Sequence, residues 1–146
     1  AVLLSGQGRN AEAEKLLREV LTAEPEHHDA AYSLGLLLVE VGEPEEAVRW
    51  IGKAARGMPR DPRAHYNLGL LLAQLSRDPE AEAALRRAAE IAPTELDILY
   101  ALADFYVKRR RAADALAVAE RMIAAHPDQA IGRQIKRLAE RMAAER

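Results

Sequence analysis

The sequence contains no cysteine, few aromatic residues and no long apolar run, and its formal net charge is only −2. Without cysteine the chain forms no disulfide bonds, thiolate zinc sites or cysteine nucleophiles. No apolar stretch reaches the length that a membrane-spanning helix needs. The net charge is too close to zero to give the general basic field that attracts nucleic acid. We therefore expect a soluble protein. A cytoplasmic location is the simplest expectation, and a periplasmic one stays open.

Alanine and leucine supply most of the apolar content. Hydrophobic residues account for 49% of the chain, whereas aromatic residues account for 4%. Both alanine and leucine are strong helix formers, and the small alanine side chain lets helices pack closely. This composition predicts an all-α fold and argues against a sandwich or a barrel. It also resembles the composition of bacterial proteins.

A repeat of fixed length organises the whole chain. Four prolines, Pro25, Pro59, Pro93 and Pro127, each stand 34 residues from the next. A fixed period of this length indicates one supersecondary unit copied along the sequence. If each proline is position 32 of its unit, position 20 is alanine in all four units: Ala13, Ala47, Ala81 and Ala115.

Each 34-residue unit is predicted to contain two helices. In the second unit, residues 29–41 carry apolar side chains at spacings of three and four, the period of an amphipathic helix. Gly42 ends that helix, and Pro44 stands at the start of the next one, where its missing N–H costs nothing. The fourth unit has Arg110 where the second has Gly42, and we still expect a turn there because the register does not slip.

Helix starts are predicted from residues that can cap them. Asp61 and Asp78 each precede a proline, which gives an N-cap followed by proline at the first helical position. The other candidate caps are Asn10, Thr94 and Asp128.

These signals divide the chain into one array. We expect a partial repeat at 1–27, full repeats at 28–61, 62–95 and 96–129, and a capping helix at 130–146. In the partial repeat, Gly6 and Gly8 flank the expected turn, and about half of the first helix is missing. The last segment is amphipathic and has no partner helix after it, as the end of a solenoid requires.

The pattern resembles the tetratricopeptide repeat family, in which Leu-Gly, Ala, a large residue and Pro recur at set spacings. The matching residues of two units are Leu34, Gly35, Leu38, Ala47, Ile51 and Pro59, then Leu68, Gly69, Leu72, Ala81, Leu85 and Pro93. The resemblance implies a right-handed α-solenoid of antiparallel helix pairs. It also implies that small residues at positions 8 and 20 let the helices approach, while larger ones at positions 7, 11 and 24 fill the layers.

The resemblance further implies a concave groove built from the first helices of successive units. Members of the family bind peptides or partner helices there, so we expect a protein–protein interaction scaffold for an extended peptide or an amphipathic helix. The expected groove residues are Tyr32, Leu36, Val39, Arg63, Tyr66, Asn67, Leu70, Gln74, Tyr100, Asp104, Val107 and Lys108. Tyrosine suits such a wall because it offers a rigid apolar face and a hydroxyl. The competing interpretation is that these tyrosines pack within their own repeats.

Other chemistries find little support in the sequence. Family members that capture a C-terminal carboxylate use concave Lys, Arg and Asn, and here only Arg63, Asn67 and Lys108 match in part. The basic run at 108–111 is read as a solvated turn, with an acidic protein or nucleic acid as alternative partners. The histidines and carboxylates do not converge, so we expect no metal site, no cofactor and no enzymatic activity.

Two further functions stay open. The truncated first helix would expose Val2, Leu3 and Leu4, which a second copy of the chain could cover, giving a homo-oligomer. Alternatively, the array could be the docking or regulatory arm of a larger enzyme.

Overall fold

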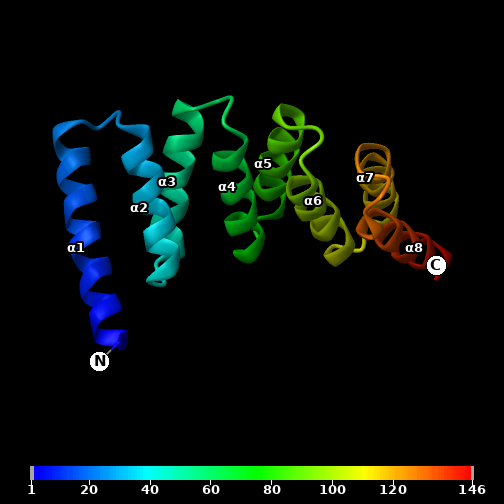
Figure 1. The fold of residues 1–146 in the computed structure, drawn as a ribbon, viewed down its shortest axis with the longest axis horizontal. Helices are drawn as coiled ribbons and strands as arrows, with labels where there is room; N and C mark the ends of the chain where they lie inside the picture. The colour runs from blue at the N-terminus through cyan, green and yellow to red at the C-terminus, as the bar shows by residue number, and fades with distance from the viewer. Residues whose placement is uncertain (1, 146) are drawn as a thin grey trace.

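The computed structural model describes the backbone of residues 2–145 and the side chains of residues 8–145. Within that range the chain is a row of eight α-helices without a strand, and successive helices stand side by side along the long axis (Figure 1). The helices are α1 (Val2–Ala23), α2 (His28–Glu40), α3 (Pro44–Gly57), α4 (Pro62–Gln74), α5 (Asp78–Ile91), α6 (Leu96–Lys108), α7 (Ala112–Ala125) and α8 (Ala130–Ala144). The predicted all-α solenoid is confirmed.

The turn inside each helix pair depends on one residue in the left-handed region. These residues are Gly42 (φ 85°), Ser76 (φ 58°) and Arg110 (φ 62°), which occupy the same place in successive repeats. Glycine adopts this conformation without strain, whereas other residues do so at a cost. The turn predicted at Arg110 is therefore confirmed, and its side chain is tolerated at the expense of backbone strain.

Ser76→Gly is expected to raise the free energy of unfolding by about 0.5–1 kcal/mol, because glycine removes this strain. The Ser76 side chain is exposed, so its loss removes little else. Chemical denaturation followed by circular dichroism measures the change. The reverse exchange, Gly42→Ser, is the matched control and should lower the same quantity. A Ser76→Gly protein no more stable than the wild type would contradict this view of the turn.

The helix caps follow the prediction only in part. Asp61 caps α4, where its Oδ1 accepts a hydrogen bond from the Arg63 backbone N–H at 2.9 Å. The other predicted caps are wrong: Asn10 and Asp78 lie inside helices, and Thr94 and Asp128 stand one residue before the actual N-caps, Glu95 and Gln129. Asp78 instead pairs with an arginine of the next repeat, a long-range contact that local sequence does not reveal.

One cap was not expected from the sequence. His27 precedes α2, and its Nδ1 accepts a hydrogen bond from the backbone N–H of Ala30 at 3.0 Å. The imidazole thereby acts as the N-cap, a role that serine or aspartate usually fills.

The turn predicted within the first repeat is wrong. A single helix, α1, runs without a break through Gly6, Gly8 and Asn10. Glycine weakens a helix by about 1 kcal/mol but keeps its backbone donor. The first unit lacks the proline that follows the turns of the second and third units, Pro44 and Pro79, although the fourth unit turns at Arg110 without one. The side chains of Val2, Leu3 and Leu4, on which the self-association hypothesis depends, lie outside the described residues.

Size complementarity fixes the two helices of each pair. A Cβ on Gly69 would lie 2.6 Å from Leu85 Cγ, and one on Gly35 would meet the Ile51 side chain just as closely. In the fourth unit both partners are alanine, Ala103 and Ala119, and both are fully buried. The expectation of small residues at position 8 is thus confirmed. The reason is that a large side chain at position 24 leaves room only for glycine opposite it.

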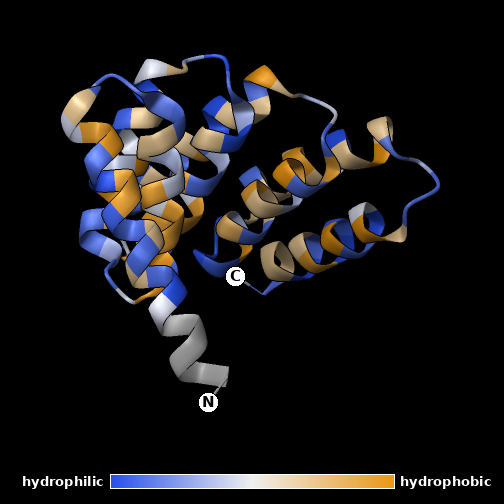
Figure 2. Ribbon diagram, turned by 60° about the vertical axis from the view of Figure 1, so that its left-hand side comes forward, coloured by the Kyte–Doolittle hydropathy of each residue, from blue (hydrophilic) through white to orange (hydrophobic). Residues whose placement is uncertain are grey.

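The core is a continuous layer between the helices. Large side chains at positions 7, 11 and 24 fill it; the buried ones are Leu34, Leu38, Ile51, Leu72, Leu85, Leu102 and Tyr106. Hydrophobic and hydrophilic residues alternate along the coloured helices (Figure 2). The final helix, α8, covers the end with Ile135, Ala139 and Met142, all buried.

Candidate functional site

The candidate site is the face formed by the first helices α2, α4 and α6, here called the inner wall. The second helices lie apart from one another on the opposite face. A cleft separates α3 from α5, and its floor carries Leu68 and Leu72 of α4. A second cleft separates α5 from α7 over Leu102 and Tyr106 of α6. The helices α4 and α6 are in direct contact, so these two first helices lie closer together than the second helices that the clefts separate.

All the predicted groove residues lie on the inner wall, and none of them is buried. Three apolar ones are exposed: Leu36 by 38%, Val39 by 39% and Tyr100 by 44%. Tyr32 and Tyr66 are half-buried and pack against the core. The three tyrosines therefore differ in their surroundings. Tyr32 and Tyr66 pack partly within the core, whereas Tyr100 presents its ring to solvent.

Hydrogen bonds and ion pairs tie adjacent helices across the inner wall. The Asn67 amide donates to the Tyr32 hydroxyl. The Arg63 guanidinium pairs with Asp97 at 2.7 Å and stands 5.4 Å from the centre of the Tyr66 ring.

The groups that could form a carboxylate clamp are therefore occupied. Arg63 and Asn67 are held by these bonds, and Lys108 pairs with Asp104 at 2.9 Å. A ligand carboxylate would have to compete with these partners within the chain. This arrangement supports the expectation that the wall does not bind a C-terminal carboxylate.

The charged wall residues Arg63, Asp97, Asp104 and Lys108 of α4 and α6 are paired, whereas Asp29 and Glu40 of α2 are exposed. The hydrogen bond from Arg63 holds the pKa of Asp97 below its ordinary value, so the pair stays ionised at neutral pH. Burial raises the pKa of both Tyr32 and Tyr66, which keeps their hydroxyls neutral. What remains available to a ligand on α4 and α6 is mainly apolar surface and tyrosine hydroxyl.

A hollow of about 670 Å³ lies beside Tyr100, where α6 begins and α8 passes. Leu96, Asp97 and Ile131 help to line it. Ile131 was missed as a site residue because the last segment was treated only as a cap. Continuing the repeat numbering shows it: Ile131 stands 34 residues after Asp97, at a groove position.

Each member of the basic run at 108–111 has an acidic partner within the chain. Lys108 pairs with Asp104 in its own helix. Arg109 binds Asp78 at 2.8 Å, donates to the Ala73 carbonyl and lies over the Phe105 ring. The other two pairs are Arg110 with Glu145 and Arg111 with Glu82. The run therefore joins repeats together, a role that charge counting along the sequence did not suggest.

No metal-binding group emerges from the side chains that the structure describes, since no three His, Cys, Asp or Glu residues come together. His126 Nε2 lies 2.6 Å from the Thr94 carbonyl, and His28 packs its ring against Gly57. Within residues 2–145, no helix has both the length and the apolarity needed to cross a membrane.

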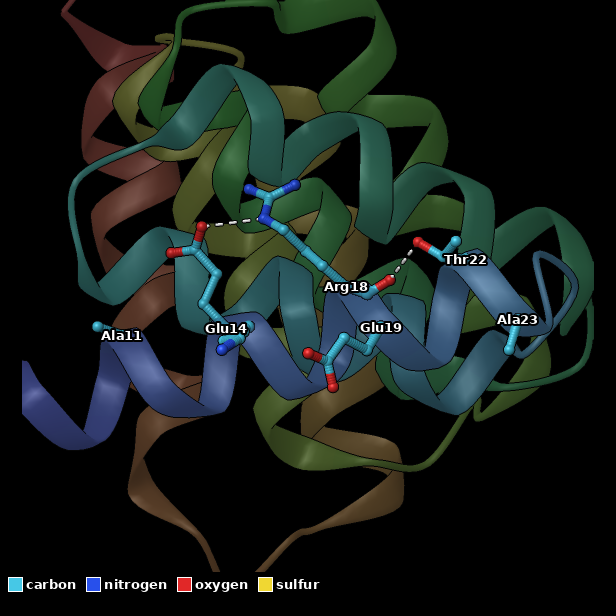
Figure 3. A pocket seen from close by; sticks show the side chains of 7 residues that line it. Ala11, Glu14, Arg18, Glu19, Thr22 and Ala23 are labelled. Carbon is cyan, nitrogen blue, oxygen red and sulfur yellow. Dashed lines mark hydrogen bonds and ion pairs between the residues drawn. The ribbon is translucent and has the colours of Figure 1, made fainter.

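A hollow on α1 also carries no site. It follows one helix, and several of its polar groups are paired: Arg18 pairs with Glu14 at 3.0 Å, and the Thr22 hydroxyl donates to the Arg18 carbonyl (Figure 3). Arg18 is also held by Glu46 of α3 at 2.9 Å. These contacts attach α1 to the first full repeat.

Comparison with known proteins agrees with this architecture. The family model described as tetratricopeptide repeat matches residues 4–75 and 72–138. No curated protein matches the chain in sequence. Solved structures do match. MamA protein is 23% identical with a TM-score of 0.84, over 96% of this chain and 76% of that one.

Two further structures extend the comparison. A tetratricopeptide repeat protein from Parabacteroides merdae is 17% identical with a TM-score of 0.85, over 97% of this chain and 56% of that one. YrrB, a TPR protein with an unusual peptide-binding site, is 24% identical with a TM-score of 0.75, over 91% of this chain and 69% of that one. At these identities the likeness shows the fold.

Proposed function

The chain belongs to the tetratricopeptide repeat family, and we propose that it binds a peptide segment along its inner wall. The fold of this family generally serves as a scaffold for protein–protein interaction. The ligand is an extended peptide or an amphipathic helix whose apolar side chains contact Leu36, Val39 and Tyr100. The chain has no catalytic role in this proposal. The carboxylates of α6 on the wall, Asp97 and Asp104, are each held by a cation.

The observation that carries the proposal is a row of solvent-accessible apolar side chains on three successive first helices, exposed on α2 and α6 and half-buried on α4. Leu36 and Val39 stand on α2, Leu70 on α4 and Tyr100 on α6. A peptide crossing these helices would cover apolar surface that is otherwise hydrated, which favours binding. The hollow beside Tyr100 has room for one apolar side chain of such a ligand. YrrB, which shares the fold, is a precedent for peptide binding.

The proposal is tested with peptides selected from a random display library on the full chain. Affinities of labelled peptides are then measured by fluorescence anisotropy. Tyr100→Ala is expected to weaken binding by about tenfold or more, because a contacting aromatic residue contributes 1–2 kcal/mol or more. Leu36→Ser should weaken it too, at the other end of the wall.

Leu16→Ser is the matched control, since Leu16 is an exposed leucine on α1, away from the inner wall. It should leave affinity within about twofold of the wild type. Circular dichroism confirms that each variant is folded. Selected peptides that bind Tyr100→Ala and Leu36→Ser as tightly as the wild type would disprove the assignment of the wall.

A further inference from the structure

The cleft between α3 and α5 lies on the face opposite the inner wall and is not used in the proposed function. Its volume is about 800 Å³, and it is open to solvent. The floor is mainly apolar, with Val48 from α3, Leu68 and Leu72 from α4, and Ala84 from α5, and His65 of α4 also lines the cleft. Gly52 leaves the α3 side of the floor without a side chain.

Four arginines and one glutamate surround this floor. Arg77 is paired with Glu80 at 3.0 Å, and Arg87 with Glu90 at 3.3 Å. The other two, Arg49 and Arg56, are exposed, and among the described side chains they have no ion-pair partner. The cleft therefore has an excess of positive charge that the chain itself does not neutralise.

Arg49 and Arg56 are placed to act together. They stand seven residues apart on α3, which puts them on the same face and about 10.5 Å apart along the helix axis. Gly52 lies between them on that face, and Arg56 Nη1 would be 3.5 Å from a Cβ built there. The two guanidinium groups thus border one open stretch of apolar floor.

The next cleft along the array shows that the fold does not require these features. The cleft between α5 and α7 stands one repeat later and has a volume of about 270 Å³. There Glu82, Arg86 and Tyr106 occupy the places of Val48, Gly52 and Leu72.

The charges of the two clefts differ as well. Ala83 and Glu90 replace Arg49 and Arg56 in the later cleft. The α5–α7 cleft is therefore filled by side chains and balanced in charge, whereas the equivalent α3–α5 cleft is open and basic. Since the backbone is equivalent, the open basic cleft reflects this particular sequence.

We propose that the α3–α5 cleft is a second docking site and that its occupant is an acidic, partly apolar segment of another protein. Carboxylates of the segment pair with Arg49 and Arg56, since guanidinium and carboxylate match in a bidentate geometry. An apolar side chain between them covers Val48, Leu68 and Leu72. A cleft open to solvent suits a polypeptide better than a small ligand, which would be left largely exposed. One array would then hold two partners, on opposite faces.

The test uses a display library of 15-residue peptides enriched in Asp and Glu, selected on the full chain and measured by fluorescence anisotropy. The double variant Arg49→Glu/Arg56→Glu is expected to weaken the selected peptides at least about tenfold. The matched control is Arg86→Glu/Arg121→Glu, which makes the same charge change at the next cleft and should weaken them less than about threefold. Gly52→Leu fills the floor without changing charge and should also reduce binding.

Three outcomes would overturn the proposal. The first is a library that yields no peptide dependent on Arg49 and Arg56. The second is an equal loss in both charge-reversed variants, which would mean general electrostatic attraction. The third is tighter, Arg49-dependent binding of a single-stranded oligonucleotide, which would make the cleft a phosphate site. The two proposals can also be told apart. If Tyr100→Ala loses peptide binding and Arg49→Glu/Arg56→Glu does not, the inner-wall proposal stands and the α3–α5 docking site is disproved.

Discussion

Leu85→Ala is expected to lower the free energy of unfolding by about 2–5 kcal/mol, because it opens a cavity where a fully enclosed leucine packs. Leu85 is 1% exposed and fills the space over Gly69. Gly69→Ala alone is expected to cost about 1–2 kcal/mol, because overpacking against Leu85 outweighs the gain in helix propensity. Chemical denaturation of each variant measures these changes.

Combining the two changes tests whether the cost of Gly69→Ala comes from its contact with Leu85 or from a general destabilisation of the helix. Together they recreate the alanine pair that Ala103 and Ala119 form in the fourth unit. In the Leu85→Ala background, Gly69→Ala should therefore stabilise the protein by up to about 1 kcal/mol. Gly52→Ala is the matched control, since its Cβ would meet only Arg56 at 3.5 Å, and it should stabilise the wild type. An equal cost of Gly69→Ala in both backgrounds would contradict the account.

Glu82→Ala is expected to lower the free energy of unfolding by about 1.5–3 kcal/mol, the range for hydrogen bonds to a charged group. Glu82 of α5 accepts a hydrogen bond from the Tyr106 hydroxyl at 2.8 Å and pairs with Arg111 at 2.6 Å. Arg111 also lies over the Tyr106 ring, 4.8 Å from its centre. These contacts join the third repeat to the fourth.

The pH dependence of this loss gives an independent check. Hydrogen bonding to Arg111 holds the pKa of Glu82 below its ordinary value, while burial raises the pKa of Tyr106 to about 12. A carboxyl with a lowered folded-state pKa stabilises above its unfolded pKa, about 4.3, and loses this contribution as pH falls through the folded value.

The difference between wild type and Glu82→Ala should therefore be full at neutral pH and shrink below about pH 4. Denaturation midpoints measured across this range test it. Glu90→Ala is the control, since Glu90 is an exposed glutamate on the same helix, and its effect should be small throughout. A Glu82 effect that does not change with pH would show that the carboxylate charge is not what stabilises the junction.

The architecture could be predicted because the same residue pattern recurs in successive 34-residue units. Apolar positions, helix-breaking prolines and small residues recur in register, so a substitution in one unit, such as Arg110 for glycine, did not mislead. The first unit lacked this support: its two glycines alone predicted a turn, and the helix α1 continues through Gly6 and Gly8. Single local signals, such as Asp78 before a proline, failed where a long-range ion pair used the side chain instead.

The sequence placed the candidate site residues on the first helices, but it did not give their contacts or exposure, and ligand binding there remains a proposal. Repeat numbering put Tyr32, Tyr66 and Tyr100 on one face, but it could not show that Asn67 binds the first of them. Nor could it show that only Tyr100 is well exposed. Contacts between repeats depend on side-chain geometry that the period does not encode. The basic α3–α5 cleft escaped notice for the same reason, since the period does not show that the space beside Arg49 and Arg56 is open or that the two arginines have no partner within the part of the chain that the structure describes.

Site-specific crosslinking tests the central claim, that peptides bind along the inner wall, most directly. A benzophenone side chain is placed at Tyr100 on the wall or at Ala83 beside the opposite cleft, and a peptide from the unbiased library is irradiated with each protein. The account predicts a crosslinked product from position 100 and none from position 83. A product from position 83 alone would contradict it.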